Sequence, residues 1–266
     1  MHDHRSVAAV FKRGRARRWL GALAVTASAY LPNSPALAQS SPGNSVGINV
    51  TALPDYEGSK SYRVLPLPTL SLSKGAIFVQ GFIGGIAYPL WPSVAVGLLI
   101  GVQPGRNQDD AAVLNGTGDI PTSFDFGAFA RWHYGPASAG LRFLQSAHAG
   151  YGNRVTLSAS YALVQKPVDR VSVSADAVWS NGPSQQTWFG IDSEQAASST
   201  AGLSAYHPSA GFSRVDLRID WDHRLNQQWS LQSAFGVGSL LGDAANSPIV
   251  ERRAAVFGSV GAAYHF

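Results

Sequence analysis

Residues 214–222 read Arg-Val-Asp-Leu-Arg-Ile-Asp-Trp-Asp, a strict alternation of charged and apolar side chains. Successive side chains of a β-strand point to opposite faces of its sheet. One face of this segment therefore carries only apolar side chains, and the other carries a charge ladder of Arg214, Asp216, Arg218, Asp220 and Asp222. The pattern predicts a strand that separates an apolar environment from a polar one.

The same two-residue period recurs along most of the chain. It predicts about 12 strands, at residues 44–52, 61–73, 75–87, 92–103, 122–134, 136–146, 153–165, 168–180, 186–192, 209–223, 227–240 and 253–266. Strands of globular proteins usually have about 5–6 residues, whereas a tilted strand crosses a bilayer in about 9–11. Most of the expected strands are longer than the globular average, which favours membrane strands over a soluble β-sandwich.

Aromatic residues support the membrane interpretation. They lie near the ends of expected strands, where interfacial girdles are found, at Trp132, Tyr134, Trp179, Trp221, Trp229 and Tyr264. The last expected strand alternates and ends in Tyr264 and Phe266, which resembles the signal read by the outer-membrane barrel-assembly machinery. Because backbone polar groups in a bilayer must be paired, strands can span it only as a closed barrel.

The sequence thus predicts an all-β protein, a single closed antiparallel transmembrane β-barrel of about 12 strands in the bacterial outer membrane. Its expected partners include outer-membrane lipids and, during biogenesis, the assembly machinery.

Residues 1–38 have the organisation of a cleaved signal peptide. Basic residues extend to Arg18, an apolar run follows, and Ala36-Leu37-Ala38 forms a small-x-small cleavage site. The apolar run has about 13 residues, too few for the roughly 20 that a membrane-spanning helix needs. The barrel domain is therefore expected at residues 39–266.

Composition excludes several classes of function. The net charge of +4 arises in residues 1–38, which hold six basic residues and one acidic residue; this leaves 14 basic and 15 acidic residues elsewhere. A basic patch for nucleic acid is therefore not expected. The chain has no Cys, which excludes disulfides, a Cys nucleophile and Cys-ligated metal centres. Charged residues make up 14%, against roughly 25% in soluble domains.

Several motifs, in order along the chain, carry a family resemblance. The first is Asp55-Tyr56-Glu57-Gly58-Ser59 with residues 65–68, and the second is Gly105-Arg106 with Asp109-Asp110 and residues 118–120. The third comprises residues 188–191 and 195–211. The last two are residues 241–250, which include Gly242, Asp243, Ser247 and Pro248, and the terminal Tyr264-His265-Phe266. Together they resemble the MltA-interacting protein family, MipA/OmpV, of outer-membrane proteins. The chain departs from that family's usual pattern at Ala201 and in the turn at residues 148–150.

The resemblance implies a non-enzymatic envelope scaffold that tethers murein-remodelling enzymes, a lytic transglycosylase and a murein synthase. A narrow small-solute pore or an adhesin is the alternative, and a barrel hydrolase is the third possibility. The hydrolase would use Asp222-His223 with a nearby Ser, but adjacency in sequence does not supply triad geometry. No histidine spacing indicates a metal site, and no cofactor is expected.

Two groups of charged residues have competing interpretations. The charge ladder at residues 214–222 could line an ion path, or its charges could pair and fill a narrow lumen. The loop at residues 103–121 is a candidate partner site, with Arg106, Asp109, Asp110 and Asp119. If both termini are periplasmic, this loop follows the fourth expected strand and is periplasmic, whereas residues 190–208 and 242–250 are external. Its acidic side could steer a basic partner; the alternative is a solvated, flexible loop.

Overall fold

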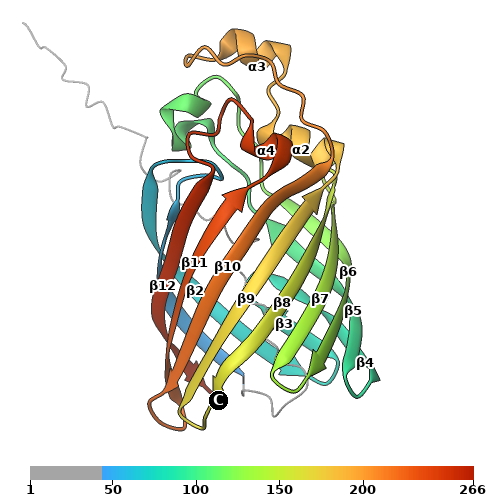
Figure 1. Cartoon of the computed structure of the whole chain (residues 1–266), viewed down its shortest axis with the longest axis vertical. Helices are drawn as coiled ribbons and strands as arrows, with labels where there is room; N and C mark the ends of the chain where they lie inside the picture. Colours follow the sequence, from blue (N-terminus) through green and yellow to red (C-terminus); the bar gives the residue numbers. More distant parts are fainter. Residues whose placement is uncertain (1–43) are drawn as a thin grey trace, which may run out of the picture.

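The computed structural model describes residues 44–266 as one closed antiparallel β-barrel of 12 strands (Figure 1). The strands are β1 (Ser45–Pro54), β2 (Tyr62–Lys74), β3 (Ile77–Gln80), β4 (Ile83–Trp91), β5 (Val94–Gln103), β6 (Ser123–Tyr134), β7 (Ala137–Ser146), β8 (Asn153–Gln165), β9 (Asp169–Ser180), β10 (Gly211–Arg224), β11 (Trp229–Leu240) and β12 (Ala254–His265). Each strand pairs with its neighbours in sequence, and β1 pairs with β12 to close the barrel. The expected signal peptide lies outside the described residues.

Short helical segments occur in the loops. They are the 3₁₀ turns Gln108–Asp110 and Ala112–Leu114, and the α-helices α2 (Gly182–Phe189), α3 (Ser193–Ser198) and α4 (Gly242–Ala245). No helix within residues 44–266 is long and apolar enough to cross a membrane.

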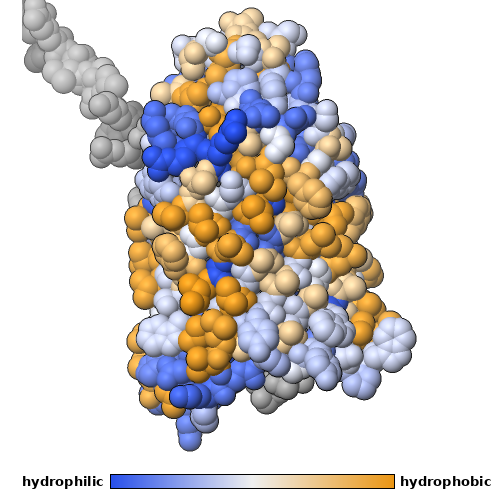
Figure 2. Space-filling model, viewed as in Figure 1, coloured by the Kyte–Doolittle hydropathy of each residue, from blue (hydrophilic) through white to orange (hydrophobic). Residues whose placement is uncertain are grey.

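The barrel wall is apolar outside and polar inside. On β10, Leu217 and Ile219 are 53% and 43% exposed, whereas Asp216 and Arg218 are 3% and 7% exposed. The charge ladder therefore lines the lumen, and the apolar residues between its members face outward. Figure 2 shows the outward residues as an apolar band across the middle of the strands, with hydrophilic residues concentrated above and below it.

The strand expected at residues 75–87 is wrong, because the chain turns back within it. Gln80 pairs with Ile83 across a two-residue turn, Gly81-Phe82, and Gly81 has a φ of +56°. Tight hairpin turns need a positive φ at their first central residue, which favours glycine there. The apolar residues on both sides of Gly81 hide this turn in the sequence, so one expected strand is in fact the hairpin β3–β4.

The strand expected at residues 186–192 is also wrong, since most of that segment belongs to α2. Asn181 is the N-cap: its side chain accepts a hydrogen bond from the backbone N–H of Ser184 at 3.0 Å. Pro183 occupies the first turn, where its missing N–H costs nothing. The two errors compensate, so the expected number of strands agrees with the structure.

The extra hairpin reverses the direction of β5 relative to the expectation. Residues 104–122 therefore connect β5 and β6 at the same end of the barrel as α2, α3 and α4 (Figure 1). The expectation that this loop lies opposite to residues 190–208 and 242–250 is wrong. The other end, which we call the turn end, has only short connections, at residues 75–76, 92–93, 135–136, 166–168 and 225–228.

The upper part of β2 has no strand on its β3 side among the described residues. β3 pairs only with Ser71–Lys74, whereas β1 pairs with β2 from Tyr62 to Ser71. The Leu70 carbonyl accepts a hydrogen bond from Gly81 at 2.8 Å, on the β3 side. The backbone N–H and C=O groups of successive residues point to alternate sides of a strand. The backbone groups of Pro66 and Pro68 therefore point to the β3 side, like those of Leu70. Because proline has no N–H, neither residue leaves an unpaired donor there.

Candidate functional site

The long loops form a packed structure, which we call the loop cap: residues 55–61, 104–122, 181–210 and 241–253. Its centre is a cluster of four fully buried apolar side chains from four different loops, Tyr56, Leu114, Ile191 and Ile249. Long apolar side chains buried together stabilise each loop against the others. The family motifs of these loops therefore converge in space, although Tyr56 and Ile249 are 193 residues apart in sequence.

Tyr56 joins the first loop to the last. Its hydroxyl donates to the Ile249 carbonyl at 2.7 Å and lies 3.3 Å from the Glu251 carboxylate. Burial, with the negative charge of Glu251, raises the pKa of Tyr56 well above its ordinary value, so the hydroxyl stays a donor. Lys60 forms an ion pair with Glu251 at 2.7 Å, which neutralises the carboxylate.

Gly58 allows the first and last loops to approach closely. Its carbonyl accepts hydrogen bonds from the backbone N–H groups of Glu251 and Arg252, at 2.8 and 2.9 Å. Its φ is +102°, and a Cβ there would lie 2.9 Å from Val250. Both the backbone conformation and the contact therefore require glycine.

Arg106 is buried inside the loop cap, where the sequence had suggested a partner-binding residue. Its backbone forms an isolated antiparallel bridge with Ile120, and its guanidinium donates to the Trp188 carbonyl at 2.8 Å. Burial lowers the pKa of Arg106 to about 10, and the negative charges of Asp110 and Glu57 oppose the shift. Arg106 thus connects the loop at residues 104–122 to α2.

The three acidic residues of the candidate partner loop have different positions. Asp110 accepts a hydrogen bond from the Asn107 backbone N–H at 3.0 Å and lies 3.8 Å from the Arg63 guanidinium. Burial raises the pKa of Asp110 above its ordinary value. Asp119 is exposed, although its carboxylate accepts from the Gln108 N–H at 2.9 Å. Asp109 is also exposed, so only two of the three present an accessible charge.

The motif around α4 also ties the cap together. Asp243 accepts from the Ser209 N–H at 2.8 Å, and its carbonyl accepts from the Tyr206 hydroxyl at 2.8 Å. Ser247 donates to the Phe189 carbonyl at 2.5 Å. Gly242, with a φ of +51°, begins α4, and Pro248 lies half-buried between Ser247 and the fully buried Ile249. In the first motif, Ser59 is fully buried. The backbone carbonyl of Asp55 accepts a hydrogen bond from the Arg63 guanidinium.

The charge ladder of β10 is paired. Arg214 binds Glu57 of the loop cap at 2.9 Å and Asp216 at 2.7 Å. Arg218 binds Asp220 at 2.8 Å. Asp222, nearest the turn end, accepts from the Gln232 amide at 3.3 Å. The geometry corresponds to paired charges that fill the lumen, with Arg214 joining the wall to the cap.

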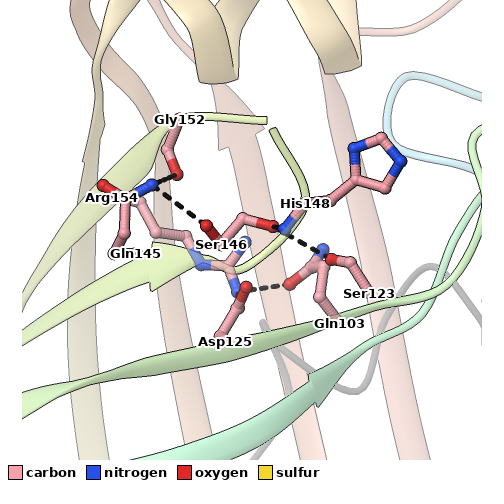
Figure 3. A network of polar contacts seen from close by, with 8 residues as sticks. All are labelled: Gln103, Ser123, Asp125, Gln145, Ser146, His148, Gly152 and Arg154. Carbon is pink, nitrogen blue, oxygen red and sulfur yellow. Dashed lines mark hydrogen bonds and ion pairs between the residues drawn. The ribbon is translucent and has the colours of Figure 1, made fainter. Parts of the chain in front are cut away.

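A second polar network occupies the lumen beside β5, β6 and β8 (Figure 3). Arg154 of β8 binds Asp125 of β6 and the Gln103 side chain at the end of β5. Nearby, the hydroxyls of Ser123 and Ser146 are 3.1 Å apart. Charge-assisted hydrogen bonds of this type are among the strongest in proteins, so the network cross-links three strands beneath the loop cap.

At the turn end, the residues of the other candidate sites have structural partners. The Phe266 N–H donates to the Asn44 carbonyl at 2.9 Å, and the Phe266 ring stacks on that of Tyr264. His223 binds Asp169 at 2.8 Å, and its sequence neighbour Asp222 binds Gln232 instead. Among residues 44–266, no group of three or more His, Asp or Glu side chains could hold a metal ion.

A family model described as "MltA-interacting protein MipA" matches residues 46–266, which is the whole described barrel apart from its first residues. The chain belongs to the MltA-interacting protein MipA family. This agrees with the resemblance of its loop motifs. With the apolar outer band of a closed barrel, family membership places the protein in the bacterial outer membrane.

Several solved structures are similar to this MipA-family barrel. The COG4313 outer-membrane channel from Pseudomonas putida F1 is 11% identical, with a TM-score of 0.43, over 87% of this chain and 99% of that one. The NanC porin is 9% identical, with a TM-score of 0.45, over 84% and 100%. The NalP translocator domain from Neisseria meningitidis is 8% identical, with a TM-score of 0.45, over 86% and 91%. None of the curated proteins matches the chain.

The sequence did not predict the buried centre of the loop cap or the network around Arg154. In the sequence, Asp125 and Arg154 alternate with the apolar residues Phe124 and Val155, which indicates their face of the strand but not which charges pair. Pairing depends on the register of the four adjacent strands β5 to β8, which no local sequence pattern specifies.

Proposed function

We propose that this MipA-family protein is a non-enzymatic scaffold of the outer membrane that tethers murein-remodelling enzymes, a lytic transglycosylase and a murein synthase. The match to a family described as MltA-interacting carries the proposal. The ion pairs of β10 and the packed loop cap support it, since they favour a rigid barrel over an open channel.

The turn end is the docking face of this proposal. In outer-membrane barrels the short turns are periplasmic and the longer loops are extracellular, and murein enzymes act in the periplasm. Four exposed basic residues flank the short turns, Lys74, Lys166, Arg170 and Arg224. They would attract an acidic surface on the partner and raise its association rate.

Charge-reversal variants at each end of the barrel test which end binds the partner. The purified barrel is immobilised and its affinity for an MltA-type lytic transglycosylase is measured at low and high salt. We expect Lys74→Glu, Lys166→Glu, Arg170→Glu and Arg224→Glu, combined, to weaken binding at least tenfold. The cap variant Asp109→Lys, Asp119→Lys serves as the control and should bind normally.

Two results would contradict this proposal. Weakening by the cap variant alone would place the partner on the loop cap, and failure of the unmodified barrel to bind would reject the scaffold. The proposal also includes cleavage of residues 1–38, so that N-terminal sequencing of the mature protein should begin at Gln39. Incubation with phospholipid and peptide substrates should give no turnover.

A narrow small-solute pore is the second candidate. A cavity of about 70 Å³ in the lumen favours it, because the interior is not completely filled. Planar-bilayer recordings distinguish the two: the scaffold predicts no steady conductance from the purified barrel, and a reproducible single-channel conductance would favour the pore.

A further inference from the structure

The arginines of the lumen fall into two groups. Arg154, Arg214 and Arg218 each bind a carboxylate of the wall. Arg131 of β6 and Arg142 of β7 differ, because no ion pair joins either one to a carboxylate within residues 44–266. The Nη1 atom of Arg131 and the Nε atom of Arg142 are both buried without a hydrogen-bond partner.

These two arginines lie together on the inner wall. In the pairing of β6 with β7, Arg131 is opposite Gly140 and Arg142 is opposite Phe129. They are therefore diagonal neighbours on one face, about 7–8 Å apart at the backbone and within reach of long side chains. Arg131 also lies over the Phe129 ring, 5.6 Å from its centre.

Both arginines line the lumen cavity of about 70 Å³. Since a water molecule needs about 10–15 Å³ of such volume, the cavity has room for roughly five waters or one small organic anion. Its lining has two halves. A polar half includes Arg131, Arg142 and Ser158, and an apolar half is formed by Phe78, Leu99 and Phe129.

The local charge is positive. The charged groups that act on Arg142 are Arg154, Asp176 and Arg131, and Arg154 is already bound to Asp125. Asp176 adds one further carboxylate, so three arginines face two carboxylates here. A buried guanidinium N–H without an acceptor is costly, and an anion between the two arginines would remove that cost.

We propose that Arg131 and Arg142 form a binding site for one small oxyanion, a carboxylate or a phosphate group, inside the barrel. The planar guanidinium matches either group with two parallel hydrogen bonds. The apolar half of the cavity would accept the short carbon chain of a monocarboxylate. This inference does not depend on the scaffold proposal, because it concerns the lumen and not the docking face.

The test uses the folded mature barrel in detergent, with acetate, butyrate and inorganic phosphate as probes. Each is titrated at constant ionic strength in a chloride background, and binding is measured by calorimetry. We expect saturable binding of at least one probe, weakened at least tenfold by Arg131→Gln or Arg142→Gln and abolished by both together. Butyrate in preference to phosphate would identify the ligand as a carboxylate, and the reverse would identify it as a phosphate.

A matched control removes the same charge elsewhere. Arg170 and Arg224 are exposed at the turn end, so the double variant Arg170→Gln, Arg224→Gln should bind the probes normally. Absence of binding by the unmodified barrel would overturn the proposal, and so would equal affinities in the lumen variant and this control. Heat-modifiable electrophoretic mobility confirms that each variant is folded.

A second variant blocks the cavity and keeps both arginines. A Cβ added at Gly140 would make only ordinary contacts, the nearest at 3.7 Å to Ser158, and the lumen cavity lies in front of it. Gly140→Ile should therefore fold and abolish binding. Normal affinity in this variant would show that the probes bind outside the cavity and would overturn the proposal.

Discussion

The two ends of the barrel are built differently. At the capped end, four long loops bury Tyr56, Leu114, Ile191 and Ile249 against one another. At the turn end, the connections have two to four residues and their charged neighbours are exposed. Loop length alone would suggest that the capped end is mobile and available to partners. The structure shows instead that this buried cluster and hydrogen bonds between the loops hold them together, so the length of these loops does not indicate mobility.

The largest difference in stability between the two ends is expected when one tyrosine at each end is replaced. Tyr56→Ala removes a fully buried ring and a hydrogen bond to Ile249, and should cost about 3–5 kcal/mol. Tyr134, beside a short turn, is 74% exposed and stacks on Trp132. Tyr134→Ala should therefore cost only about 0.5–1.5 kcal/mol. Urea unfolding gives both values, and protease cleavage within residues 181–210 should increase only in Tyr56→Ala. Equal costs would contradict a packed cap.

A glycine at each end tests the role of close approach. Gly58→Ala introduces both an unfavourable φ and a contact with Val250, and should destabilise the barrel by about 2–3 kcal/mol. Gly75 has a φ of +59° but no atom near an added Cβ, so Gly75→Ala should cost about 1–2 kcal/mol. The difference in free energy of unfolding measures the contact between the first and last loops. No difference would mean that the first loop can move away from Val250.

Neighbouring aspartates within the cap sharpen the comparison further. Asp110 caps a 3₁₀ turn and lies near Arg63, so Asp110→Ala should cost about 1 kcal/mol. Asp109 is exposed, and Asp109→Ala should change stability by less than about 0.5 kcal/mol. Both are measured by urea unfolding of the folded barrel. A larger loss for Asp109→Ala would show that its carboxylate has a structural role in the cap.

The smallest effect on stability is expected at the C-terminus. Phe266 is 64% exposed and makes one backbone hydrogen bond, to Asn44. Its deletion should change the free energy of unfolding by less than about 0.5 kcal/mol but should slow assembly, because its aromatic ring resembles an assembly signal. Pulse-labelling with heat-modifiable electrophoresis follows the folded fraction over time. An unchanged assembly rate would reject Phe266 as part of that signal.

The fold followed from the sequence where one face of a strand meets lipid. The alternation at residues 214–222 specifies the inward and outward faces of β10, because each side chain belongs to one environment. Alternation does not predict the turn at Gly81, because apolar residues continue through it. It also does not predict the helix that begins after Asn181, where capping outweighs an apolar run. Both failures arise from local backbone chemistry that a two-residue period does not contain.

The candidate site was less predictable than the fold. The motifs named the right loops, but Arg106 is an internal tie and only Asp109 and Asp119 present exposed charge. The sequence also did not distinguish Arg131 from Arg154, since both lie on lumen faces. In the part of the chain that the structure describes, Arg154 binds a carboxylate and Arg131 does not. This difference depends on whether a carboxylate lies nearby on another strand, which is decided by the register of the strands.

The short hairpin β3–β4 also constrains how this barrel can evolve. Inserting residues on both sides of Gly81 would lengthen the hairpin alongside β2, but Pro66 and Pro68 would offer it no N–H donors. An insertion would gain a full set of hydrogen bonds only if both prolines were replaced as well. Growth of this part of the wall therefore requires at least four coordinated mutations, two insertions and two proline replacements, which protects the short hairpin against drift by single insertions.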